Sequence, residues 1–165
     1  QKPELIQGTH LVMNVAVQQA YYLEAPQDHR AVFLLPWKGQ SLLGTTEQLY
    51  QGDPAKIAPL KKENEYLLEV FKHYFPTLDH SIAGDMAGCR VLTSDKKNPF
   101  KRSREIVLTV DNKQQPRVIS MIGGKLTVYR KTAQKVIHLI RPSLPHKQAI
   151  ADTAQLPLIP VERLC

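Results

Sequence analysis

The chain has 165 residues, of which 42% are hydrophobic and 22% are charged, which is enough to bury the core of one soluble domain or of a domain with an added fragment. It contains no run of about 18 apolar residues, which excludes a transmembrane helix in this sequence, and we expect no signal peptide because no charged-then-apolar leader is visible. The formal net charge of +7 suggests an anionic partner, but aromatic residues make up only 7% and no groove-reading module or stacking platform is recognisable, so we expect no nucleic-acid partner.

The first part of the chain predicts β-strands. Residues 9–17 alternate and are rich in Val and Leu, as expected of a strand. Residues 31–37 and 41–46 are two further apolar runs, and the three-residue link 38–40 between them contains glycine, which is typical of a hairpin. Because Pro36 lacks a backbone donor, we expect its strand to lie at a sheet edge or to end there.

Residues 60–75 predict an amphipathic helix that packs on a sheet. Pro59 stands where a helix can begin, and Pro76 stops it. The apolar residues that recur at helical spacing are Leu67, Leu68, Phe71 and Phe75.

Three further strands are predicted downstream. Residues 81–92 resemble a strand that two glycines interrupt, and the polar stretch 95–102 predicts a loop. Residues 105–110 and 117–122 predict strands joined by a turn at 111–113.

A helix from about residue 125 to 140 follows the last strand, with Gly123 and Gly124 between them. The apolar face of this helix would consist of Leu126, Tyr129, Ala133, Val136, Ile137 and Ile140. A helix start leaves backbone N–H groups unpaired and carries partial positive charge, so it can hold an anion or an electron-rich carbonyl. The paired glycines would let a ligand approach the backbone, although an ordinary tight turn is the alternative.

Taken together, these elements predict an α+β fold: a mostly antiparallel sheet with packed helices. After Pro142 the chain is proline-rich and irregular. No internal repeat is visible.

Four polar residues at strand edges and turns are candidates for chemistry: His10, Arg90, Arg104 and Lys125. Three cations and one imidazole would suit a phosphate monoester next to a titratable group. Each has an ordinary alternative, because an arginine near a strand end is commonly solvated or ion-paired and a histidine in an apolar strand is commonly structural. The pattern does not show that the four converge.

We expect no metal site, because the histidines do not stand at metal-ligand spacing with cysteines or carboxylates. The two cysteines, Cys89 and Cys165, form no spacing motif, and this usage favours a reducing compartment over a disulfide framework.

Several short motifs occur in a fixed order between residues 8 and 141. They are Gly8-Thr9-His10, Leu35-Pro36-Trp37-Lys38-Gly39, Gly44-Thr45-Thr46, Gly52-Asp53-Pro54, Ala87-Gly88-Cys89-Arg90, Ser103-Arg104 and Gly123-Gly124-Lys125-Leu126-Thr127-Val128-Tyr129-Arg130. In this order they resemble the FAD-dependent, aerobic-type glycerol-3-phosphate dehydrogenases. The order is far more specific than any one motif.

The resemblance implies a D-amino-acid-oxidase-like flavoenzyme fold, of which this chain would be an excised piece. Residues 1–115 would be the substrate-binding lobe, 116–142 the returning strand, glycine pair and helix of the FAD-binding domain, and 143–165 an irregular tail. The glycine-rich N-terminal segment that binds the ADP half of FAD in this family would be a missing partner of the same chain.

The reaction implied by the resemblance is oxidation of sn-glycerol 3-phosphate to dihydroxyacetone phosphate, with hydride transfer to FAD and electrons passed to membrane quinone. The resemblance also implies a cytoplasmic enzyme, peripheral on the inner face of the cytoplasmic membrane. The alternatives are a glycerol-3-phosphate oxidase that uses oxygen and a stand-alone phosphate-binding module without redox activity.

Residue roles follow from the same resemblance. His10 and Arg90 match catalytic positions: His10 is a candidate for accepting the proton of the C2 hydroxyl, and Arg90 would lie beside substrate and flavin. Together with Arg90, Arg104 and Lys125 would bind the phosphorylated substrate. The residues implied to contact the flavin are Gly123, Gly124, Lys125, Leu126 and Thr127. The chain departs from the family pattern at Gln7, Val91 and Val128, which leaves the subfamily and the electron acceptor open.

Overall fold

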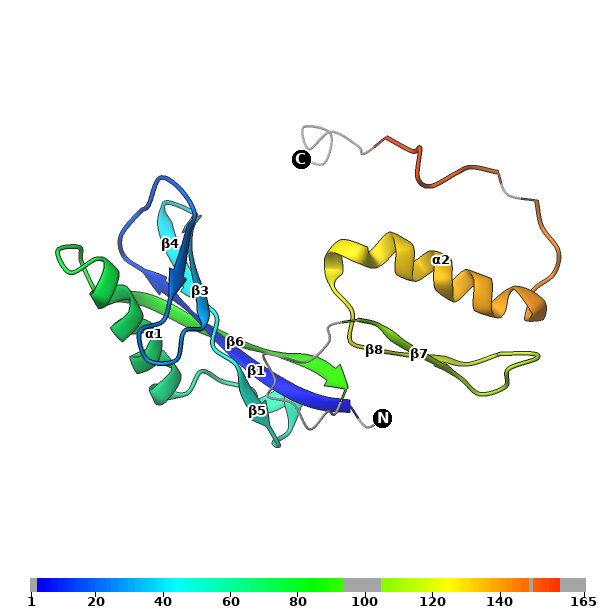
Figure 1. Cartoon of the computed structure of the whole chain (residues 1–165), viewed down its shortest axis with the longest axis horizontal. Coiled ribbons are helices and arrows are strands. Elements are labelled where there is room, and N and C mark those ends of the chain that lie inside the picture. Colours follow the sequence, from blue (N-terminus) through cyan, green and yellow to red (C-terminus); the bar gives the residue numbers. More distant parts are fainter. Residues whose placement is uncertain (1–2, 94–104, 149, 158–165) are drawn as a thin grey trace. The chain divides into compact units, whose positions relative to one another are not determined.

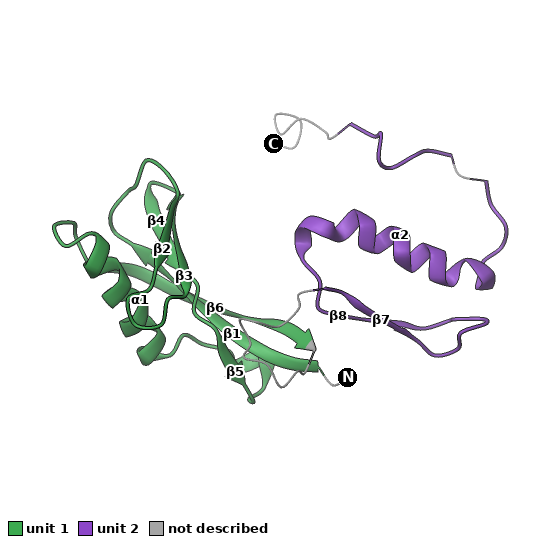
Figure 2. Ribbon diagram, viewed as in Figure 1, with its two compact units in different colours: residues 1–103 green, residues 104–165 purple. Residues whose placement is uncertain are grey.

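The computed structural model describes residues 3–93, 105–148 and 150–157. The chain forms two compact units, residues 1–103 and residues 104–165 (Figure 2). The functional division at residues 1–115, 116–142 and 143–165 stays a prediction.

In its described residues, the first unit is an antiparallel sheet with an α-helix packed on it (Figure 1). Its strands follow the order β2-β3-β4-β1-β5, and β6 pairs with β1. The elements are β1 (Pro3–Met13), β2 (Tyr21–Glu24), β3 (Ala31–Trp37), β4 (Gln40–Gly44), β5 (Gln48–Tyr50), α1 (Lys61–Tyr74) and β6 (Ile82–Thr93). Strand β1 is therefore central, with β4 and β5 along one side and β6 along the other.

The predicted hairpin is confirmed as β3 and β4. Its turn is tighter than expected, because Gln40 already pairs with Trp37 and only Lys38 and Gly39 lie between the strands. Both turn residues have positive φ, 48° and 80°, as the favoured two-residue hairpin turn requires. Pro36 lies past Leu34, the last residue of β3 that pairs with β2. Its missing backbone N–H therefore removes no hydrogen bond between β2 and β3.

The bounds predicted for the first strand, 9–17, are wrong at both ends. Strand β1 begins at Pro3 because β6 supplies partners even for Pro3, Glu4 and Gly8, which have little intrinsic strand preference. It ends at Met13, where Asn14 turns away and donates its backbone N–H to the carbonyl of Ser81. Val15 and Val17 still pack against the core, but from a loop.

The helix predicted for 60–75 is confirmed as α1, and it covers the core of the first unit. Leu67, Val70 and Phe71 of α1 are fully buried. They pack with residues from the sheet: Leu11, Met13, Leu23, Val32, Leu34 and Leu43. This packing fixes one face of β1 against the helix and leaves the opposite face for a site.

The second unit consists of a two-stranded antiparallel sheet and a helix among its described residues. The predicted strands are confirmed in shorter form as β7 (Val107–Val110) and β8 (Ile119–Ile122). Asp111 closes the turn between them, since its Oδ1 accepts the backbone N–H groups of Arg117 and Val118 at 3.0 and 3.1 Å. The strand predicted at 81–92 is likewise confirmed, as β6 in the first unit.

The second helix starts later than predicted. Gly123 and Gly124 have positive φ, and a 3-10 turn at Leu126–Val128 precedes the α-helix α2 (Tyr129–Ile140). The predicted apolar face is present but uncovered: no residue of α2 is buried, and Leu126, Tyr129 and Ile137 are 87%, 63% and 55% exposed.

The predicted α+β fold with mostly antiparallel strands is confirmed. The loop expected at 95–102 lies outside the described residues. Among the residues that the structure describes, no helix is both long and apolar enough to cross a membrane, and no group of three metal-ligating side chains occurs.

Candidate functional site

A pocket of about 430 Å³ lies where β1 and β6 pair in the first unit. Residues directly opposite each other in an antiparallel pair share a face, and the pairs here are Gly8 with Gly88 and His10 with Met86. The lining residues are Gly8, His10, Thr45, Met86, Ala87, Gly88, Cys89 and Arg90. The structure therefore brings together two of the predicted site residues, His10 and Arg90, across two strands.

Arg90 is held in place by two acceptors from the segment after β4. Its Nη1 donates to Glu47 Oε1 at 2.6 Å, and its Nη2 donates to the backbone oxygen of Thr46 at 3.1 Å. The Glu47 side chain is 4% exposed and that of Arg90 is 31% exposed. Sequence reasoning missed Glu47, although the acid follows directly on the Gly44-Thr45-Thr46 motif.

His10 lies against the backbone of β4. A Cβ added at Gly44 would come within 2.2 Å of His10 Cδ2, so glycine is required there for the ring to occupy its position. Burial, and secondarily the positive charge of Arg90, lower the pKa of His10 below its usual 6.5. A neutral imidazole is the form that can accept a proton, so the site favours His10 as a base near neutral pH.

The face of β1 that is turned toward α1, opposite the face that lines the pocket, carries a buried polar network centred on Glu63 of α1. Glu63 Oε2 accepts from Gln7 Nε2 at 2.6 Å and Thr9 Oγ1 at 2.9 Å, and Glu63 Oε1 accepts from Thr46 Oγ1 at 2.5 Å. Thr46 Oγ1 in turn accepts the backbone N–H of Thr9 at 2.8 Å. This network ties the start of α1, β1 and the segment that holds Arg90 into one rigid support.

Gly8 is the point where this support and the pocket meet, and Gly8→Ala is expected to disturb both. A Cβ at this position would lie 2.6 Å from Thr45 Oγ1, 2.7 Å from Arg90 Nη2 and 2.9 Å from the oxygen of Thr46. Because one of these contacts is backbone, we expect about 1–3 kcal/mol of destabilisation and displacement of the guanidinium. The measurement is the free energy of unfolding of Gly8→Ala by chemical denaturation, with Gly88→Ala as the control. An added Cβ at Gly88 meets no atom within 4 Å, so equal destabilisation of the two variants would contradict the argument.

The remaining predicted site residues lie in the second unit or outside the described residues. Gly123 and Gly124, with φ of 75° and 94°, lead into Lys125, Leu126 and Thr127, all exposed in the second unit. Arg104 lies outside the described residues. That these residues join His10 and Arg90 around one ligand stays a prediction.

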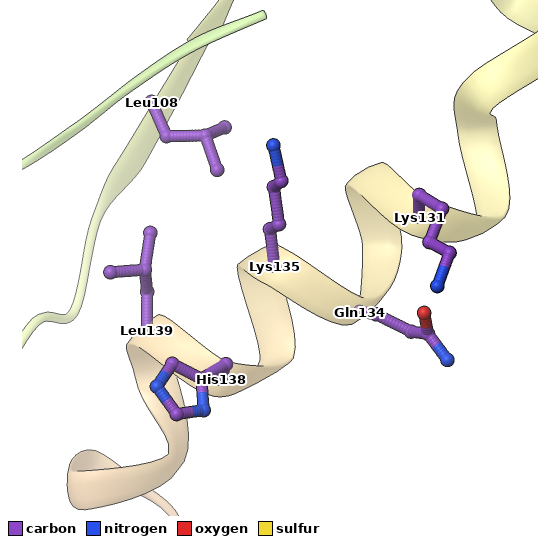
Figure 3. A pocket seen from close by; sticks show the side chains of 6 residues that line it. All are labelled: Leu108, Lys131, Gln134, Lys135, His138 and Leu139. Carbon is purple, nitrogen blue, oxygen red and sulfur yellow. The ribbon is translucent and has the colours of Figure 1, made fainter.

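The second unit has a different pocket, of about 500 Å³, between α2 and β7. Figure 3 shows its lining: Leu108 of β7 and Lys131, Gln134, Lys135, His138 and Leu139 of α2. Among the residues that the structure describes, none of the predicted site residues lines this pocket.

No family model matches the chain. It is 35% identical to the glycerol-3-phosphate dehydrogenase of Pseudomonas aeruginosa, over 93% of this chain and 31% of that protein. It is 34% identical to the aerobic glycerol-3-phosphate dehydrogenase of Escherichia coli, over 84% of this chain and 29% of that protein. The D-erythritol 1-phosphate dehydrogenase of Brucella abortus is 29% identical over 86% of this chain and 29% of its own length.

The fold has a solved counterpart in the glycerol-3-phosphate dehydrogenase of Bacillus halodurans complexed with FAD. The TM-score is 0.68 at 28% identity, over 84% of this chain and 26% of that one. The chain thus has the α+β fold of a segment of an FAD-containing oxidoreductase. The resemblance to the FAD-dependent glycerol-3-phosphate dehydrogenases is confirmed, and the chain spans about a third of the length of the relatives it matches.

Proposed function

We propose that this chain is the substrate-binding lobe and a flavin-contacting segment of a longer enzyme that oxidises sn-glycerol 3-phosphate to dihydroxyacetone phosphate. The observation that carries the proposal is the pocket that joins His10 and Arg90, in a chain similar over most of its length to glycerol-3-phosphate dehydrogenases. FAD would be the cofactor, as it is bound in the structural relative.

The residues predicted to contact FAD have a backbone that suits a flat ligand. Gly123 and Gly124 adopt positive φ, which other residues rarely do, and the chain that follows them is exposed. Gly123, Gly124, Lys125, Leu126 and Thr127 would hold the flavin edge through main-chain groups. FAD would supply the acceptor for the hydride that leaves C2.

The chain's own residues would bind and orient the substrate. Neutral His10 would accept the proton of the C2 hydroxyl while hydride leaves the same carbon, so that C2 becomes the carbonyl carbon of the product. The cations Arg90, Arg104 and Lys125 would neutralise the substrate phosphate and fix its distance from the flavin.

Membrane quinone as the final acceptor, and a peripheral site on the inner face of the cytoplasmic membrane, remain part of the proposal. The rest of the FAD site would come from the remainder of the longer chain. The exposed apolar face of α2 supports this, because such a face in a complete soluble domain is normally covered.

The test is anaerobic titration of the full-length enzyme, loaded with FAD, with sn-glycerol 3-phosphate. The flavin absorbance is expected to bleach with one equivalent of substrate and to return when a quinone analogue is added. Glycerol is the control for the phosphate, and D-erythritol 1-phosphate tests for a longer polyol phosphate. Peroxide release in air would favour the oxidase, and FAD that never bleaches with any phosphorylated polyol would contradict the proposed reaction.

A further inference from the structure

We infer that Glu47 is a positioning residue, which holds the guanidinium of Arg90 in the orientation that the pocket requires. The inference rests on the proposed function, because it takes Arg90 as the group that meets substrate and flavin. Glu47 itself does not line the pocket, and the role inferred for it is exercised through Arg90.

Both terminal nitrogens of the Arg90 guanidinium donate to protein acceptors, and Arg90 still lines the pocket. Nη1 binds Glu47 Oε1 at 2.6 Å and Nη2 binds the oxygen of Thr46 at 3.1 Å, so two acceptors on consecutive residues define the plane of the group. The Glu47 side chain is 4% exposed and does not line the pocket, while Arg90, at 31%, does. A charge-assisted bond in this position is short and directional.

The segment that carries Glu47 is itself fixed, so the ion pair has a rigid base. Thr46 binds Glu63 through its hydroxyl, and its backbone N–H donates to the oxygen of Thr9 at 3.3 Å. Arginine has a long side chain with several rotatable bonds. Without Glu47, the backbone oxygen of Thr46 would be the remaining hydrogen-bond partner of Arg90 among the residues that the structure describes. The pair therefore sets the geometry of a site residue, beyond adding stability.

The main test compares Glu47→Gln with Glu65→Gln in the full-length, FAD-loaded enzyme. Glu65 forms an exposed ion pair with Lys61 on α1 and controls for loss of a carboxylate. Glu47→Gln is expected to lower kcat/KM for sn-glycerol 3-phosphate about 100-fold, the cost of a misplaced site group. Glu47→Asp, which keeps the charge one carbon further back, is expected to recover part of the loss.

A double substitution separates positioning from simple stabilisation. In an Arg90→Met background, adding Glu47→Gln should change kcat/KM less than about twofold, because the group that Glu47 positions is gone. A further loss as large as that in the unsubstituted enzyme would overturn the inference. The same holds if both Glu47 variants unfold the protein while Arg90→Met leaves it folded, since the pair would then serve stability.

A measurement on the 165-residue chain does not depend on activity. By NMR, the Arg90 guanidinium should show restricted rotation in the unsubstituted chain and in Glu65→Gln, and faster rotation in Glu47→Gln, where the Thr46 oxygen alone restrains it among the described residues. Equal rotation in all three would refute the positioning role whatever the enzyme does. If rotation changes as expected but the unsubstituted enzyme never reduces its flavin, the proposed function fails and the structural role of Glu47 stands.

Discussion

Replacing Glu63 with alanine is expected to lower the free energy of unfolding of the first unit by about 4 kcal/mol. Glu63 is 4% exposed, and its carboxylate accepts three side-chain hydrogen bonds, from Gln7, Thr9 and Thr46. Alanine would leave the hydroxyls of Thr9 and Thr46 without this acceptor, while Gln7 Nε2 would keep only the backbone oxygen of Ala58. It would also remove the acceptor for the backbone N–H of Leu60 at the start of α1. One substitution therefore removes the acceptor that several buried donors share.

Urea unfolding followed by the fluorescence of Trp37 is the appropriate measurement, because this is the one tryptophan of the chain and it lies in the first unit. Glu65→Ala, two residues along the same helix and exposed, should change stability by less than about 0.5 kcal/mol. Glu63→Gln should fall between the two, since it keeps one acceptor oxygen. Similar stabilities for the Glu63 and Glu65 variants would show that the network contributes nothing.

Local sequence signals predicted the parts of the fold that local chemistry decides. The helix between Pro59 and Pro76 and the hairpin at Lys38-Gly39 follow from proline and glycine conformations and from short-range spacing, and both are present. The bounds of β1 depend instead on partners up to about 90 residues away along the chain, such as Thr93 opposite Pro3. No pattern within residues 3–8 could have indicated that pairing.

The site was predictable only in part, for a similar reason. His10 and Arg90 meet because β1 and β6 pair in one register, which spacing alone does not reveal; the resemblance supplied their association. Glu47 and Glu63 were missed, because an isolated glutamate in a loop or on an amphipathic helix is ordinarily solvated. Only the tertiary structure shows that both carboxylates are buried among donors.

The start of α2 illustrates a different limit. Helical periodicity extends back to Leu126, and the prediction therefore began the helix at residue 125. The two glycines have positive φ, and a tighter 3-10 turn at Leu126–Val128 stands between them and the α-helix, which begins at Tyr129. Side-chain spacing cannot separate these two turn types over three residues.

Replacing His10 with glutamine is expected to lower kcat of the full enzyme by about 100- to 10,000-fold, the usual contribution of a positioned base. Glutamine keeps a similar size and polarity but cannot accept the proton of the C2 hydroxyl. The measurement is the rate of anaerobic flavin reduction at saturating sn-glycerol 3-phosphate, with the neighbouring Met86→Leu as a control that alters the pocket lining without a titratable group. A loss confined to KM would assign His10 to binding alone.

The pH dependence of the same residue gives an independent result. Burial first, and the charge of Arg90 second, lower the pKa of His10 below 6.5, so activity that depends on neutral His10 should fall only as the pH approaches this lowered pKa. Folding stability should decrease as the pH falls from about 6.5 toward the lowered pKa, because the unfolded chain, with the higher histidine pKa, takes up more protons in that interval. In Arg90→Met the pKa of His10 should rise yet stay below 6.5, since burial remains. NMR titration of His10 in the 165-residue chain measures this directly, and a pKa that does not move in the variant would mean that Arg90 does not act on the imidazole.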